Sequence, residues 1–144
     1  MTTMTFSEGE SIPPKTIESI DASDTKLIAA LLRDPYKPHF DPQQAAELGY
    51  PDLLNQGPAN LSYLFQIVFD VIESPADVRS FDVRFQDMVF VGQTVEVTAT
   101  VEETRVEGGE GVVTFAVALE KENGEVAVGG TVEAAVPADR VDGD

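Results

Sequence analysis

The sequence contains no cysteine and no long apolar run. Without cysteine, the chain cannot form disulfides, thiol nucleophiles or zinc–thiolate sites. No apolar stretch approaches the roughly 18–20 residues that span a bilayer, and the first residues lack the basic and apolar regions of an export signal. We therefore expect a soluble, cytoplasmic protein.

Basic side chains are also scarce, at 9 against 26 acidic ones, which gives a formal net charge of −17. Binding to nucleic acid or to anionic lipid requires clustered lysine and arginine, so neither partner is expected. Excess acid keeps a protein soluble, and it suits a salt-rich cytoplasm equally well.

Length and composition fit one globular domain. The 144 residues are 42% hydrophobic, which is enough for a buried core, and they show no linker or internal repeat. We expect a single domain over residues 1–144, with flexible ends at residues 1–5 and 137–144.

Three segments in the first half show helical patterns. Asp21 is an expected N-cap, and the apolar residues that follow it at helical spacing form one face until Pro35 ends the helix near residues 33–34. Asp41-Pro42 opens a second helix, which Gly49 ends. Residues 58–72 form a third helix that is apolar almost all round, which is typical of a helix buried in a core.

After residue 75 the apolar period changes from 3.6 to 2. Alternation predicts strands over residues 81–85, 95–101, 113–119 and 126–136, with Gly129-Gly130 as a bulge or close approach and a further short strand over residues 16–20. Helices followed by antiparallel strands indicate an α+β fold, in which a curved antiparallel sheet wraps around the long apolar helix. The free edges of such a sheet, or a helix face, favour dimerisation.

The candidate chemistry centres on the one histidine, His39, which follows Asp34 by five residues. An isolated pair of this kind is more often a plain loop feature than a site. Asp34, however, stands at the predicted end of a helix, where a carboxylate is unfavourable. A residue that local stability disfavours is a candidate for a functional role.

The spacing around this pair resembles a known family, the MaoC-like (R)-specific enoyl-CoA hydratases. Their signature, Asp-x-Asn-Pro-(Ile/Leu)-His-x-Asp with a later Ala and Gly, is matched at Asp34, His39, Asp41, Ala45 and Gly49. Two later stretches, residues 81–85 and 92–95, are similar to the family's strand pair, so the likeness covers about residues 6–136.

Two departures from the family pattern stand out. Tyr36-Lys37-Pro38 replaces the middle of the signature, and Gln56-Gly57 stands where a His-Gly pair is usual. Both resemble the small hot-dog subunits that pair with a second MaoC-like chain in steroid side-chain degradation.

The resemblance implies a hot-dog fold and the hydration of a trans-2-enoyl-CoA to a 3-hydroxyacyl-CoA, or the reverse dehydration, in fatty acid or steroid metabolism. Asp34 and His39 would activate one water between them. The backbone N–H of Gly57 would stabilise the enolate-like thioester oxygen, or Gly57 would simply turn the chain into the helix. The resemblance implies neither a cofactor nor a metal.

Four further residues are candidates for substrate binding. Asn55 and Gln56 would hydrogen-bond the acyl or pantetheine part, or only close their loop. Lys37 and Arg84 would meet the phosphates of CoA, or remain ordinary surface charges. An acidic chain repels an acidic acyl carrier protein at long range, so acyl-CoA is the expected substrate.

Two other functions fit the same resemblance. The chain could be a non-catalytic or co-catalytic small subunit of a heteromeric MaoC-like hydratase. Its partner is then a second hot-dog chain in a heterodimer, rather than a second copy in a homodimer. The chain could also be a hot-dog acyl-CoA thioesterase, but the carboxylate for that reaction would be Asp70, which lies near the end of the long helix rather than in its first turns.

Overall fold

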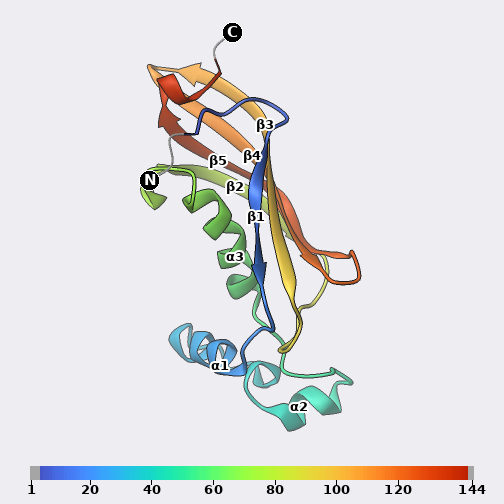
Figure 1. The fold of residues 1–144 in the computed structure, drawn as a ribbon. Coiled ribbons are helices and arrows are strands. Elements are labelled where there is room, and N and C mark those ends of the chain that lie inside the picture. Colours follow the sequence, from blue (N-terminus) through green and yellow to red (C-terminus); the bar gives the residue numbers. More distant parts are fainter. Residues whose placement is uncertain (1–3, 143–144) are drawn as a thin grey trace.

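Five strands form one antiparallel sheet in the order β1-β3-β4-β5-β2, in a computed structural model that describes residues 4–142. The strands are β1 (Ser11–Ile17), β2 (Val78–Phe85), β3 (Val95–Glu107), β4 (Glu110–Lys121) and β5 (Val126–Pro137). The sheet curves around α3 (Gly57–Phe69), as Figure 1 shows. This arrangement is the predicted α+β fold.

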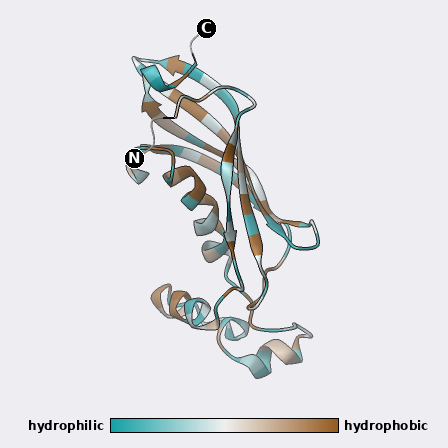
Figure 2. Cartoon of the chain, in the orientation of Figure 1, coloured by the Kyte–Doolittle hydropathy of each residue, from teal (hydrophilic) through white to brown (hydrophobic). Residues whose placement is uncertain are grey.

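The core lies between the sheet and α3. Alternate residues of the central strands turn inward, and Figure 2 shows the resulting bands of apolar and polar residues along the strands. Each large apolar side chain buried in this way stabilises the fold by about 1.5–3 kcal/mol. The fully buried side chains of the sheet include Val97, Val101, Phe115, Leu119, Val128 and Val132.

The long helix is buried on one side only, which corrects the expectation of a helix buried nearly all round. Leu64, Ile67 and Val68 face the sheet and are inaccessible to solvent. Phe65 is only partly buried and lies edge-on to Phe81 of β2. Its ring also stacks on Phe69 at 5.7 Å between centroids, and Phe69 is 38% exposed. No second layer among residues 4–142 covers the side of α3 that faces away from the sheet.

The short helices lie together at one end of the sheet, opposite η3 (Ala138–Arg140), as seen in Figure 1. They are α1 (Ala22–Leu31), η1 (Lys37–His39) and α2 (Pro42–Glu47), and η2 (Pro75–Asp77) precedes β2. Asp21 caps α1 through Ser23 N, and Asp41 caps α2, as predicted. No helix among residues 4–142 is long and apolar enough to cross a membrane.

The apolar face of α1 points outward. Leu27, Leu31 and Leu32 are all more than half exposed, and Leu31 reaches 72%. The residues that face the protein are instead Thr25 and Ala29, which are buried. Helix α1 therefore contacts the rest of the protein through Thr25 and Ala29 rather than through its leucines.

The first strand begins earlier than the sequence pattern predicts. It covers Ser11–Ile17 instead of residues 16–20 and pairs only with β3, so it forms one edge of the sheet. Pro13-Pro14 lies within it, where the register shifts between Ile12 and Lys15. Proline has no N–H to donate and is tolerated at an edge, which explains why this proline pair does not end the strand.

Residues 137–142 are bonded to the body of the fold through Arg140. The guanidinium of Arg140 donates from Nε to Met4 O at 2.8 Å and from Nη2 to Val71 O at 2.9 Å. These bonds tie the two ends of the described chain to the end of α3. Of the ends expected to be flexible, residues 1–3 and 143–144 lie outside the described residues.

Gly130 lies at a close approach between β5 and β2, as the Gly129-Gly130 pattern predicts. A Cβ atom at this position would overlap the carbonyl oxygen of Asp82 on the neighbouring strand, and the φ of Gly130 is +156°. Only glycine allows β2 to pair here, and the pairing of β2 with β5 continues to Phe85, which lies beside the start of α3.

Candidate active site

Asp34 is placed by the end of α1. Asp34 N donates to Ala29 O at 2.9 Å and Arg33 N donates to Ala30 O at 3.1 Å, which is the hydrogen-bond pattern of a Schellman motif. Arg33 has a φ of +53°, a position where glycine is usual. The motif turns the chain sharply out of the helix, so Asp34 is fixed at the turn.

Each oxygen of the Asp34 carboxylate accepts one hydrogen bond. Oδ1 accepts from Tyr36 N at 3.0 Å, and Oδ2 accepts from Gln56 Nε2 at 2.9 Å. The backbone bond from Tyr36, the Gln56 bond and the nearby His39 together lower the pKa of Asp34, against a smaller opposing effect of burial. The carboxylate is therefore ionised at neutral pH.

His39 faces this carboxylate from η1. Its Nδ1 lies 2.7 Å from Leu54 O, and because a carbonyl only accepts, Nδ1 carries the proton. Nε2 faces Asp34 Oδ2 at 3.4 Å. The ring is 7% exposed, so its orientation is held by the fold.

An aromatic ring covers His39 from one side. Tyr36 lies edge-on to the imidazole, with 5.3 Å between the ring centroids. The hydrogen bond between the phenols of Tyr36 and Tyr50 raises the pKa of Tyr36, so the phenol stays protonated. Sequence reasoning treated Tyr36 only as a departure from a signature, and no pattern in the sequence indicated this contact.

The segment around Leu54, whose carbonyl oxygen contacts His39 Nδ1, is hydrogen-bonded to two other parts of the chain. Asn55 N donates to Val89 O at 2.8 Å, which anchors the segment to the loop before β3. The Asn55 side chain accepts from Thr25 Oγ1 at 3.0 Å and donates to Asn60 Oδ1 at 2.8 Å. This buried network joins α1 to α3, so the structure places the Asn55 side chain among protein partners rather than in open space.

Gln56 supports Asp34 and leaves one of its own atoms unpaired. It is the N-cap residue of α3 but makes no side-chain capping bond, because its amide turns to Asp34. The side chain is 1% exposed, and Oε1 has no hydrogen-bond partner within the described residues. An acceptor buried without a donor is unfavourable unless a ligand or water completes it.

Gly57 opens α3 beside this amide. As the first helical residue it has no intrahelical acceptor for its N–H, and no other partner within residues 4–142 accepts from it. A Cβ at Gly57 would lie 3.3 Å from Phe85 Cε1. The absence of a side chain thus lets the Phe85 ring pack closely against the first turn of α3.

This geometry can hold one water for proton transfer. The neutral form of His39 offers an electron pair at Nε2, and ionised Asp34 offers another at Oδ2. A water that donates one hydrogen to each has its own lone pairs directed away from both, as an attacking nucleophile requires. No group of three His, Cys, Asp or Glu side chains that could hold a metal ion occurs in the described part of the chain.

A family model described as a MaoC like domain matches residues 9–123. The chain belongs to the MaoC-like dehydratase family. A search of curated proteins finds no match.

Solved structures show the same hot-dog fold as this MaoC-like chain. The unliganded R-hydratase PhaJ1 from Pseudomonas aeruginosa is 22% identical, with a TM-score of 0.80 over 92% of this chain and 83% of that one. The (R)-hydratase from A. caviae involved in PHA biosynthesis is 20% identical, with a TM-score of 0.81 over 92% and 98%. The ChsH1-ChsH2 complex from Mycobacterium tuberculosis is 22% identical, with a TM-score of 0.76 over 90% and 98%.

The remaining candidates of this MaoC-like chain are more dispersed. Lys37 is exposed and borders a shallow depression of about 390 Å³ together with Tyr36. Arg84 precedes Phe85 on β2, and successive side chains of a strand point to opposite faces. Since Phe85 faces Gly57, Arg84 lies on the face of the sheet away from α3. Within one chain, Arg84 therefore does not meet Asp34.

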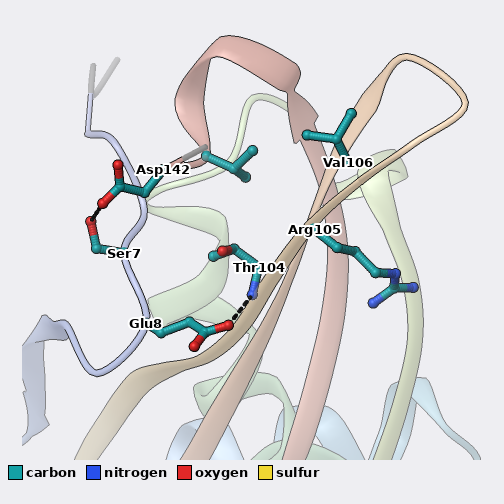
Figure 3. Close-up of a pocket in the computed structure, with 7 residues that line it drawn as sticks. Ser7, Glu8, Thr104, Arg105, Val106 and Asp142 are labelled. Carbon is teal, nitrogen blue, oxygen red and sulfur yellow. Dashed lines mark hydrogen bonds between the residues drawn. The ribbon is translucent and has the colours of Figure 1, made fainter. Parts of the chain in front are cut away.

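Another cavity, of about 730 Å³, lies at the opposite end of the sheet, and Figure 3 shows its lining. Ser7 donates to Asp142 at 2.8 Å, and Glu8 accepts from Thr104 N at 3.5 Å. Arg105 is paired with Glu107. Because these groups already satisfy one another, the smaller region around Asp34 and His39 is the better candidate active site.

Proposed function

We propose that the chain hydrates a trans-2-enoyl-CoA thioester to a (3R)-hydroxyacyl-CoA, or catalyses the reverse dehydration. The observation that carries this proposal is the separation of 3.4 Å between His39 Nε2 and Asp34 Oδ2. In the forward direction the water oxygen bonds to the β-carbon while His39 takes a proton from it. A proton is then delivered from the same site to the α-carbon, so both parts of the water end on the product.

The N–H of Gly57 would stabilise the negative charge that develops on the thioester oxygen. A preorganised donor at this point stabilises the enolate-like transition state more than the substrate. Its position at the start of a 13-residue helix supports this role, because the N-terminal end of a helix favours negative charge. Lys37, exposed beside Tyr36, remains a candidate for contact with the carrier.

We also propose that the working unit contains two hot-dog chains. β2 is an edge strand, and its Phe81 and Phe85 are 52% and 55% exposed. Together with Phe69 on α3 they form an uncovered aromatic surface next to Gly57. An apolar surface of this kind favours a partner, which would be a second copy or a related chain. Sedimentation of the purified chain as a monomer at micromolar concentration, alone and with its genomic neighbours, would refute the proposal.

Hydration of crotonyl-CoA, followed by loss of enoyl absorbance, tests the reaction. Asp34→Asn and His39→Gln should each lower kcat by about 10²–10⁴, the usual contribution of general acid–base catalysis. Asp70→Asn is the matched control, because Asp70 ends α3 and pairs with Lys15 at 2.9 Å on the surface. Equal rates in all three variants and the wild type would refute the assignment.

The same assay separates the alternatives. Release of free thiol without hydration would favour a thioesterase, although Asp70 stands roughly 20 Å along α3 from Gly57 at 1.5 Å per residue. Activity only after addition of a second MaoC-like chain would identify a subunit of a heteromeric enzyme. If Asp34→Asn still abolished that joint activity, the chain would be co-catalytic rather than a scaffold.

A further inference from the structure

The nine basic residues of this acidic chain differ in the partners they have. Four of them form ion pairs with carboxylates: Lys15 with Asp70, Arg79 with Glu110, Arg105 with Glu107 and Glu133, and Lys121 with Asp87. Arg140 is bound by backbone carbonyls. The other four, which are Lys26, Arg33, Lys37 and Arg84, make no ion pair within residues 4–142.

Three of these unpaired cations lie in one short segment. Residues 25–40 contain Lys26, Arg33 and Lys37 with Asp34 as the only acidic residue, a net charge of +2. The remaining 128 residues carry 6 basic and 25 acidic side chains, a net charge of −19. With so many carboxylates available, basic side chains without a partner are unexpected, and they gather in the segment that carries Asp34 and His39.

Two of the three cations border the same hollow as Asp34. Lys26 and Arg33 line a depression of about 380 Å³ with Asp34, and its floor includes Ala29 and Phe40. Lys26 lies within α1, and Arg33 follows the end of the helix. The Asp34 carboxylate is bound by Gln56 and Tyr36, so neither cation is held by it.

The position of Arg33 has a conformational cost. Its φ of +53° lies in the left-handed region, which is unfavourable by roughly 1–2 kcal/mol for a residue with a side chain. Glycine would complete the Schellman motif without that cost. A large cation at this point is thus disfavoured by the backbone, and no carboxylate in the described chain compensates it.

We propose that Lys26 and Arg33 bind the phosphate groups of the substrate's CoA carrier at the entrance to the site. This inference rests on the proposed function, because it assigns the carrier of the same thioester. The long pantetheine arm separates the phosphates from the reacting carbons, so phosphate-binding cations belong at the entrance rather than beside His39. Local positive charge attracts a small anion, whereas the net charge of −19 elsewhere repels an acidic carrier protein.

Two thioesters with the same acyl group test the proposal. Crotonyl-CoA carries phosphates, and crotonyl-N-acetylcysteamine does not. Lys26→Gln and Arg33→Gly should each raise KM for crotonyl-CoA about five- to tenfold, as expected for loss of a charge-assisted contact near the surface. The kcat should be unchanged, and so should kcat/KM for the N-acetylcysteamine thioester. Lys15→Gln removes the same charge far from the depression and should leave both substrates unaffected.

Arg33→Gly also separates binding from folding. Because glycine suits a φ of +53°, this variant should melt no lower than the wild type while it loses affinity for CoA. An equal effect of Lys15→Gln and Lys26→Gln on KM would overturn the proposal, since bulk charge alone would then explain it. Faster turnover of a crotonyl carrier-protein thioester than of crotonyl-CoA would also overturn it.

Calorimetric binding of butyryl-CoA, which cannot be hydrated, distinguishes this inference from the proposed function. Tight binding that Lys26→Gln weakens, in a chain that hydrates nothing, would keep the phosphate site and refute the reaction. If the chain hydrates crotonyl-CoA but the wild type and Lys26→Gln bind butyryl-CoA equally well, the proposed reaction is kept and the phosphate site is refuted.

Discussion

Replacement of Gln56 by leucine should reduce activity without unfolding the protein. The Gln56 amide donates to Asp34 Oδ2 at 2.9 Å, and a hydrogen bond to a charged group contributes about 1.5–3 kcal/mol. If that bond serves to hold Asp34 in place for the water, its loss lowers kcat about ten- to hundredfold, at 1.36 kcal/mol per factor of ten.

Stability should change much less than activity, because two effects of the replacement oppose each other. The bond to Asp34 is lost, but so is Oε1, which is buried and has no partner within the described residues. A buried acceptor without a donor costs about 1–3 kcal/mol, so its removal offsets most of the lost bond. Leucine also has a volume close to that of glutamine, so the core opens no large cavity.

Three measurements check this reasoning. Urea unfolding of Gln56→Leu should give a free energy close to that of the wild type, while turnover of crotonyl-CoA falls. Carbon-detected NMR should show the pKa of Asp34 raised towards its ordinary value, since the Gln56 bond is one of the causes that lower it. Gln56→Asn keeps an amide on a side chain that is one carbon shorter, and its kcat should be close to that of Gln56→Leu. Wild-type kcat with an unmoved Asp34 pKa would refute the positioning role, as would equal losses of rate and stability.

Three further results are expected. Gly130→Ala should separate β2 from β5, because the new methyl group overlaps Asp82 O. The free energy of unfolding should fall by about 1–3 kcal/mol or more, as measured by urea unfolding. An unchanged urea midpoint would contradict the close approach. Thr25→Val should destabilise the fold by about 1–3 kcal/mol, because Asn55 Oδ1 loses a buried donor, and thermal melting measures this. Since folding lowers the pKa of Asp34, its ionised form stabilises the protein above the ordinary Asp value of about 4 and ceases to do so as pH falls through the lowered value. The stability difference between wild type and Asp34→Asn should therefore be largest at pH 7 and narrow towards pH 3; a constant difference would contradict it.

Sequence alone was sufficient where a structure depends on a few neighbouring residues. The caps at Asp21 and Asp41 are local, and both are present as predicted. The alternating strands and the close approach at Gly130 also followed from the pattern, because residue size and period determine them within a short window. The spacing of Asp34 and His39 in the sequence likewise identified them as a candidate pair.

Features that depend on distant partners could not be read in this way. The leucines of α1 suggested an apolar face against the protein, but Thr25 and its bond to Asn55, thirty residues away, orient the helix differently. Arg140 donates to Met4 O and Val71 O, which lie 136 and 69 residues away in the chain. The amide of Gln56 reaches back 22 residues to Asp34, and no local pattern specifies such a contact.

The two edges of the sheet differ in a way that limits how far chains can assemble. At one edge, Pro13-Pro14 interrupts the row of N–H groups and shifts the register of β1, so another strand cannot add there in sequence. At the other edge, β2 has no such interruption over Val78–Phe85. A molecule with one free sheet edge can pair with one neighbour through that edge, and the pair then has no free edge for a third molecule. Growth into an extended β-fibre by this route is therefore blocked within the first strand itself.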